Sequence, residues 1–138
     1  MKSKVLNISF DKEASKSSYD IVIGTNLISN PAPYLKNYIE KRKIIIIHDD
    51  YFSPIQKKNS YFYKFLEAIK ENCNNVHLIS IPGGDKTKNI NHLNEIIETT
   101  LSFEIDRDSI IIAFGGGVVG DIAGFVSSIV LRLSLIHI

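Results

Sequence analysis

Residues 109–126, SIIIAFGGGVVGDIAGFV, change abruptly in character along their length. The first part is an apolar, mostly β-branched run that is typical of a strand buried on both faces. Three glycines follow, and then small apolar residues that favour a closely packed helix. A strand, a glycine turn and a helix start together let backbone N–H groups approach a phosphate. The spacing of Gly115, Gly117 and Gly120 fits GxGxxG, although a tight turn with close packing explains that pattern equally well.

Outward from this stretch, strand-like and helix-like segments alternate from residue 43 onward. Strands are predicted at residues 43–48, which contain four consecutive isoleucines, and at residues 76–81 and 109–114. Apolar residues at helical spacing predict helices within residues 60–73 and 89–101. The predicted apolar faces consist of Phe62, Phe65, Leu66 and Ile69 in the first helix and of Ile90, Leu93, Ile96, Ile97 and Leu101 in the second. This alternation predicts an α/β fold, a Rossmann-like parallel sheet with flanking helices and right-handed crossovers.

The segment before residue 43 follows a different pattern. Alternating apolar residues predict two strands, at residues 5–10 and 19–24, around a polar loop at residues 11–18. Residues 26–40 are a weak helical stretch that Pro31 and Pro33 interrupt.

Bulk composition is that of a globular domain. The chain has 138 residues, 44% of them hydrophobic, and a formal net charge of +1, which argues against nucleic acid as a partner. Cys73 is the only cysteine, so no internal disulfide forms, and no run has the length of a membrane span or a secretory signal. We therefore expect a cytoplasmic protein without a membrane partner. The histidines, which lack metal-site spacing, are expected to be structural or on the surface: His48, His77, His92 and His137.

Three predicted strands end in chemically distinctive segments: HDDY at residues 48–51, PGGDKTK at 82–88 and GGGVVGD at 115–121. Ligands of parallel sheets bind outside these carboxyl ends. Asp49 could accept hydrogen bonds from both hydroxyls of an adenosine ribose, or Asp49 and Asp50 could simply begin a polar loop.

Two lysines in the second segment, Lys86 and Lys88, lie at or just before a predicted helix start. Cations oppose the helix dipole there, by about 0.3–1 kcal/mol each, unless an anion binds. The alternative is a solvated surface, with Asp85 or Thr87 as the helix cap.

Taken together, these strand ends resemble the N-terminal nucleotide-binding domain of the 3-dehydroquinate synthase family, in the sugar phosphate cyclase group. The resemblance extends from about YDIVIG, residues 19–24, to Arg132. It is most specific in DRDSIIIAFGGGVVGDIAGFVSSIVLR, where an acidic-basic-acidic lead-in, GGGxxGD, AGF and an arginine eleven positions after Asp121 stand in family order.

The resemblance implies particular roles. Asp49 would hold the adenosine ribose, and Arg132 would face the substrate. Two departures stand out, since Asp85 replaces a glutamate of the family's GExxK pattern and Tyr51 stands where an asparagine often follows the ribose acid. The remaining residues implied to bind the dinucleotide lie in the second and third strand-end segments: Gly83, Gly84, Asp85, Lys86, Thr87, Lys88, Gly115, Gly116, Gly117, Val118, Val119, Gly120 and Asp121.

The resemblance also implies an activity for the full-length parent. It would convert 3-deoxy-arabino-heptulosonate 7-phosphate, a sugar phosphate, to 3-dehydroquinate and phosphate. The resemblance implies NAD and a divalent metal, zinc or cobalt, as cofactors and a homodimer as the assembly. No catalytic residue and no metal ligand is expected within this chain. Open alternatives are another sugar phosphate cyclase, an NAD-dependent polyol or glycerol-phosphate dehydrogenase, and a non-catalytic nucleotide-binding module.

The family pattern breaks off at Leu133. We expect residues 1–132 to form an incomplete NAD-binding domain and residues 133–138, LSLIHI, to be a non-native tail translated from a sequencing adapter. The alternative is a terminal strand, which alternating apolar residues also suit. On the first interpretation the chain is a fragment, inactive by itself.

Overall fold

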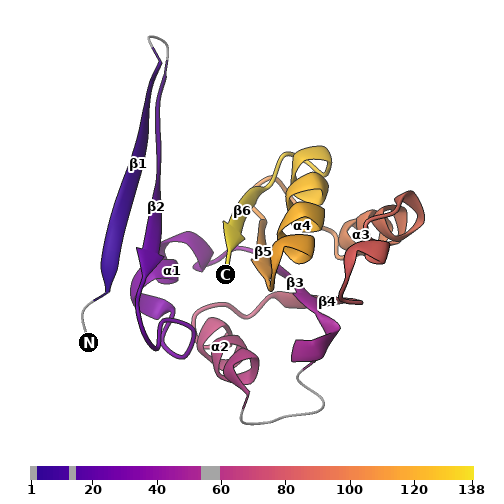
Figure 1. Ribbon diagram of the computed structural model, residues 1–138, viewed down its shortest axis with the longest axis horizontal. Helices are drawn as coiled ribbons and strands as arrows, with labels where there is room; N and C mark the ends of the chain where they lie inside the picture. Colours follow the sequence, from indigo (N-terminus) through magenta and orange to yellow (C-terminus); the bar gives the residue numbers. More distant parts are fainter. Residues whose placement is uncertain (1–2, 13–14, 54–59) are drawn as a thin grey trace.

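The computed structural model describes residues 3–12, 15–53 and 60–138 (Figure 1). The described strands are β1 Lys4–Lys12, β2 Ser15–Ile23, β3 Ile44–Asp49, β4 Val76–Ile81, β5 Ile110–Phe114 and β6 Ser134–His137. The α-helices are α1 Ala32–Ile39, α2 Tyr61–Lys70, α3 Ile90–Ser102 and α4 Gly117–Ile129. Two short 3₁₀ turns follow strands, η1 Asp50–Phe52 and η2 Asp85–Thr87. No helix among the described residues is long and apolar enough to span a membrane.

Four strands form one parallel sheet in the order β4-β3-β5-β6. Ile46 of β3 lies opposite Leu78 of β4 and Ile112 of β5, and Ile112 lies opposite Ile136 of β6. All four strands therefore end at the same edge of the sheet. The predicted α/β fold with parallel strands and flanking helices is confirmed.

Helices cover both faces of this sheet, which explains the four consecutive isoleucines of β3. Ile44 and Ile46 pack in the cluster that contains α1 and α2, and Ile45 and Ile47 pack in the cluster that contains α3 and α4. All four side chains are completely buried. Each such burial contributes about 1.5–3 kcal/mol to folding, and a strand with solvent on one face would not tolerate this run.

Helix α2 agrees with its predicted apolar face. Its buried residues are Phe62, Phe65, Leu66 and Ile69. The helix begins after Ser60, whose hydroxyl accepts a hydrogen bond from the Tyr63 backbone N–H at 3.1 Å. The periodic pattern and the capping residue together place this helix correctly.

Helix α3 agrees with its prediction only in part. Ile96 is buried, but Ile90 and Leu101, predicted to lie on the same apolar face, are 64% and 51% exposed. Thr100 is buried in that region instead, because its hydroxyl donates to the Ile96 carbonyl at 2.7 Å and so leaves no polar group unpaired.

The cap of α3 also differs from the expectation of Asp85 or Thr87. Asn89 is the capping residue, and its side-chain oxygen accepts hydrogen bonds from the backbone N–H groups of Asn91 and His92, both at 3.1 Å. Residues 85–87 form the 3₁₀ turn η2 before α3 starts, so the N-cap of α3 comes after them in the chain.

The strands β1 and β2 form a separate antiparallel hairpin that projects from the α/β body (Figure 1). The expected polar loop at residues 11–18 is wrong in its extent, since strand pairing continues from Phe10–Ser17 to Lys12–Ser15. Backbone pairing favours this extension, because each further pair adds ladder hydrogen bonds without any demand on side-chain polarity.

Residues 134–137, within the segment expected to be a non-native tail, form β6 at the edge of the sheet. This strand lies against α4, where a Cβ on Gly120 would be 3.3 Å from the His137 ring and one on Gly124 would be 3.8 Å from Leu135. The small residues of α4 thus allow β6 to approach closely. That residues 133–138 are a non-native tail stays a prediction, because native and non-native segments can both form a strand.

Candidate functional site

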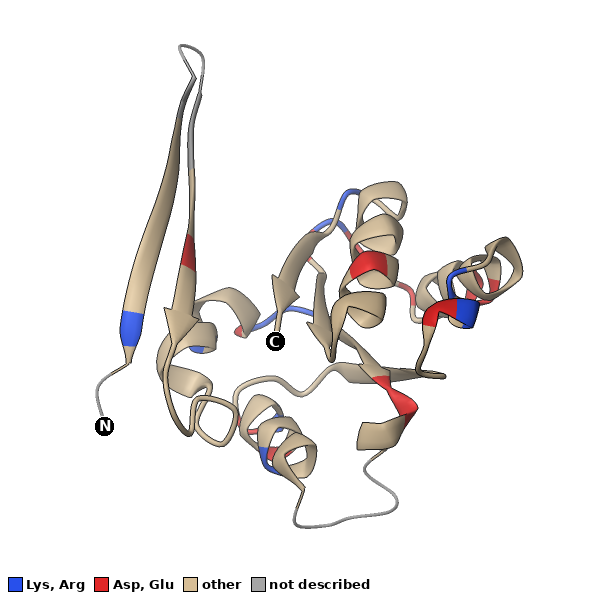
Figure 2. Ribbon diagram, in the orientation of Figure 1, with Lys and Arg blue, Asp and Glu red and all other residues tan. Residues whose placement is uncertain are grey.

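The strand order places a topological switch point, and with it the expected binding crevice, between β3 and β5. After β3 the chain runs through α2 to β4, and after β5 it runs through α4 to β6, on the opposite face and in the opposite direction across the sheet (Figure 1). Adjacent strands whose connections diverge in this way mark the binding crevice of open α/β sheets. Asp49 and the glycine turn at residues 115–117 lie at its mouth, and Figure 2 shows the acidic segment at the end of β3.

Asp49 is held in place by its own turn. One carboxylate oxygen, Oδ1, accepts a hydrogen bond from the Tyr51 backbone N–H at 2.9 Å. The other, Oδ2, points toward the turn after β4, where a Cβ on Gly83 would be only 2.9 Å away. Glycine at residue 83 therefore makes room for the half-buried Asp49 carboxylate.

His48 supports the end of β3 from inside the core. The ring is only 2% exposed, its centroid is 4.5 Å from that of Phe62, and Nδ1 is 2.9 Å from the Asp49 carbonyl oxygen. Burial lowers the pKa of His48, because removal from water penalises the charged ring.

The other histidines lie outside this crevice region or on the surface. The His77 ring stacks on Phe103 with centroids 4.1 Å apart, and the His92 ring is 3.0 Å from the Asn89 amide nitrogen. Nowhere in residues 3–12, 15–53 and 60–138 do three or more histidine, cysteine or acidic side chains gather as they would around a metal ion.

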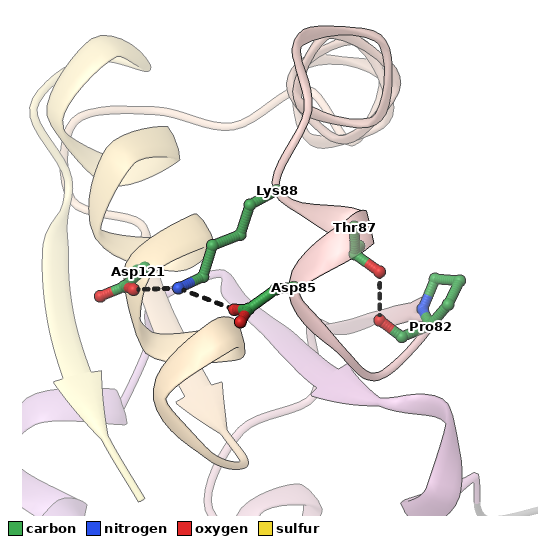
Figure 3. A network of polar contacts seen from close by, with 5 residues as sticks. All are labelled: Pro82, Asp85, Thr87, Lys88 and Asp121. Carbon is green, nitrogen blue, oxygen red and sulfur yellow. Dashed lines mark hydrogen bonds and ion pairs between the residues drawn. The ribbon is translucent and has the colours of Figure 1, made fainter.

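Backbone conformation and an internal hydrogen bond stabilise the turn after β4. Gly84 has φ +95°, a conformation that other residues rarely adopt. The Thr87 side chain is 3% exposed and its hydroxyl donates to the Pro82 carbonyl at 2.7 Å (Figure 3). Thr87 therefore stabilises the loop through its side chain, and its contact with the dinucleotide stays a prediction.

Lys88 joins this loop to α4. Its Nζ lies 2.7 Å from Asp121 Oδ2 and 3.4 Å from Asp85 Oδ1 (Figure 3). The hydrogen bond with Asp121 raises the pKa of Lys88. Two carboxylates of the chain itself thus supply negative charge beside Lys88, and contact of Lys88 with the dinucleotide stays a prediction. Lys86 lies exposed one turn earlier.

The glycine turn leaves the start of α4 open. Gly115 cannot carry a side chain, since its Cβ would lie 2.7 Å from Val119 Cγ2, whereas Cβ atoms on Gly116 and Gly117 would meet nothing within 4 Å. Gly116 is the N-cap and offers no side-chain hydrogen bond. The first backbone N–H groups of a helix have no partner within it, so those at residues 117–119 are suited to an anion at this turn.

Arg132 does not join these residues. It follows the far end of α4, a 13-residue helix, which places it roughly 20 Å from the glycine turn. Its side chain is exposed. A role for Arg132 in substrate binding stays a prediction. In this structure Arg132 lies beyond the opposite end of α4 from the glycine turn.

Site chemistry follows from these positions. A carboxylate at the end of β3 suits a vicinal diol, uncapped N–H groups at the start of α4 suit a pyrophosphate, and the glycines at residues 83 and 117 leave room for both. The donor set fits an adenine dinucleotide. Sequence reasoning missed the Lys88–Asp121 pair, since no local pattern links residues 33 positions apart.

Comparison with known proteins agrees with this arrangement. The family model described as 3-dehydroquinate synthase N-terminal matches residues 78–138, which include the segment at 133–138. The 3-dehydroquinate synthase of Prochlorococcus marinus strain MIT 9312 is 39% identical over 117 residues, covering 83% of this chain and 31% of that protein. The chain thus spans about a third of the length of such relatives.

Solved structures share the fold. The crystal structure of 2-deoxy-scyllo-inosose synthase complexed with carbaglucose-6-phosphate, NAD⁺ and Co²⁺ has a TM-score of 0.76 at 20% identity, covering 98% of this chain and 34% of that one. The 2-epi-5-epi-valiolone synthase from Streptomyces hygroscopicus subsp. jinggangensis 5008, with NAD⁺ and Zn²⁺ bound, has a TM-score of 0.63 at 26% identity, covering 93% and 32%.

Proposed function

The chain belongs to the 3-dehydroquinate synthase family, and we propose that it is the NAD-binding part of an enzyme that converts 3-deoxy-arabino-heptulosonate 7-phosphate to 3-dehydroquinate and phosphate. NAD, when bound, supplies a hydride acceptor that later returns the hydride. The names of the relatives support the reaction, and the NAD⁺ in two solved neighbours supports the cofactor.

The observation that carries the proposal is the meeting of three strand ends at one crevice. Asp49 accepts hydrogen bonds from the ribose hydroxyls through the oxygen that faces Gly83. The open N–H groups that begin with Gly117 bind the pyrophosphate. Lys88 and Asp121 fix the loop after β4 against α4, so that this part of the site is assembled before the ligand arrives.

The remaining parts of the reaction fall outside this chain in the proposal. Co²⁺ and Zn²⁺ in the solved neighbours support a divalent metal in the parent enzyme. Its ligands and most groups that bind the sugar phosphate would come from the two thirds of the relatives' length that this chain does not match. A homodimeric parent and a cytoplasmic location are likewise predictions.

Titration of the chain with NAD, measured by calorimetry, tests the proposal. In Gly117→Val the added side chain enters open space, so the fold survives, but it occupies the position of the pyrophosphate. Loss of hydrogen bonds to a charged group predicts an affinity for NAD reduced about tenfold or more. Gly124→Ala, on the same helix as Gly117, is the matched control, because its Cβ makes only an ordinary contact with Leu135 of β6.

Circular dichroism establishes that both variants are folded before their affinities are compared. Equal NAD affinity in wild type and Gly117→Val would refute the assignment of the glycine turn. A chain that binds no NAD at millimolar concentration would refute the proposed function itself.

A further inference from the structure

We infer that Tyr51 is a stacking platform for the adenine ring of the dinucleotide, an inference that rests on the proposed function. Tyr51 follows Asp49, the acid that we propose for the ribose, by two residues and places a large planar ring beside that site.

The position of Tyr51 is coupled to the acid that binds the ribose. Its backbone N–H donates to Asp49 Oδ1 at 2.9 Å, and this bond forms the start of η1. Adenine is bonded directly to the ribose, so a ribose held by Asp49 carries its base within a side chain's length of Tyr51. The turn thus brings an aromatic ring to the place where the base must lie.

Neighbouring rings orient the Tyr51 side chain. Its ring meets the Phe52 ring nearly at right angles, at 86° and 5.2 Å between centroids. Phe52 in turn meets Phe114 at 85° and 5.4 Å, and Phe114 is buried at the end of β5. The three rings connect the ends of β3 and β5 across the crevice, and Tyr51 is 74% exposed at the outer end of this series.

Such an exposed, supported ring suits a purine. Base–aromatic stacking uses the π-face of the base and needs no specific hydrogen-bond partner, so it stabilises adenine wherever a ring lies parallel to it. The energy comes from the ring face rather than from the phenolic hydroxyl. Phenylalanine in place of Tyr51 should therefore preserve the stacking on adenine, whereas leucine or asparagine should not.

The experiment measures the affinity of the 138-residue chain for NAD and for nicotinamide mononucleotide, which lacks adenine. Tyr51→Leu and Tyr51→Asn are expected to weaken NAD binding about fivefold or more, the lower end of base–aromatic stacking, and to leave nicotinamide mononucleotide binding unchanged. Tyr51→Phe is expected to bind NAD like wild type. Tyr61→Leu is the control, since Tyr61 is 66% exposed but begins α2, away from the three-ring series.

NMR gives an independent readout. The adenine H2 and H8 resonances of NAD should shift upfield on binding to wild type and to Tyr51→Phe, and this ring-current shift should be lost in Tyr51→Leu. Equal NAD affinity in wild type and Tyr51→Leu overturns the inference while leaving the proposed function intact. A similar loss in Tyr51→Phe, or an equal loss for nicotinamide mononucleotide, also overturns it. A wild-type chain that binds no NAD overturns both.

Discussion

His48 and Asp49 are sequence neighbours with opposite surroundings. The His48 side chain lies in the core against Phe62, whereas the Asp49 carboxylate reaches the mouth of the crevice. This alternation is the ordinary geometry of a strand, in which successive side chains point to opposite faces. At the last residues of β3 it places a buried titratable group directly beneath the acid that we propose for the ribose.

His48 makes the folded chain sensitive to acid. Its pKa is lowered in the folded state, so the unfolded chain binds the proton more readily as the pH falls below about 6.5. The stability that the neutral ring contributes is present above that pH and is lost as the pH falls through the folded-state pKa, at no more than about 1.4 kcal/mol per pH unit. Urea unfolding between pH 7.5 and 5 measures this slope.

His48→Gln should flatten the dependence of unfolding free energy on pH, even where its overall stability is lower. His92→Gln is the matched control, because His92 lies on the surface of α3 and should leave the slope as in wild type. An unchanged slope in His48→Gln would assign the acid sensitivity to other groups, with Asp49 and Asp50 as its nearest charged neighbours.

At the scale of elements, the β1–β2 hairpin differs from the rest of the fold. Strand register places Leu6 with Ile21 and Ile8 with Tyr19 on one face of the hairpin. On that face Tyr19 is 53% exposed, Ile21 41% and Ile23 57%. A two-stranded ribbon covers neither its face nor its edges, and such apolar surface promotes association.

Replacing Tyr19 and Ile21 together by threonine should reduce self-association of the chain, because threonine keeps the preference for a strand and removes apolar area. Sedimentation velocity over a range of concentrations measures the effect. Asn7→Thr, on the opposite face of the hairpin, is the control. The prediction is wrong if the double variant associates as strongly as wild type.

At the scale of the whole molecule, the structure supplies one wall of the catalytic site that we propose. The crevice presents groups for a dinucleotide, whereas the described residues contain no cluster of three or more metal-ligating side chains. A sugar phosphate held only from one side also loses the exclusion of water that an enclosed pocket gives. We therefore expect this chain to bind NAD without turning over the substrate.

We predict that the 138-residue chain alone does not convert 3-deoxy-arabino-heptulosonate 7-phosphate. The assay supplies NAD, zinc or cobalt ions and the sugar phosphate, and follows release of inorganic phosphate. Turnover approaching about 1 per second, an ordinary enzymatic rate, would contradict this prediction and show that the chain holds a complete site. The control is the same mixture without protein.

Much of the fold was predictable because its signals are local. Four consecutive isoleucines identify a strand buried on both faces, and the spacing of Phe62, Phe65 and Ile69 identifies a helix. Sequence alone was less successful for α3, where Ile90 and Leu101 have the right spacing but lie beyond the surface that the helix buries. Periodicity gives the direction of an apolar face and not the extent of its contact with the core.

The amino-acid sequence by itself determined the strands, the glycine turns and the acid at the end of β3, because backbone preference and side-chain polarity act over a few residues. Tertiary structure alone decided that Lys88 pairs with Asp121, that the Asp49 carboxylate rests against Gly83, and that Arg132 lies at the far end of α4. Those relations depend on strand order and helix length, which bring distant residues together or hold them apart by packing that no local pattern records.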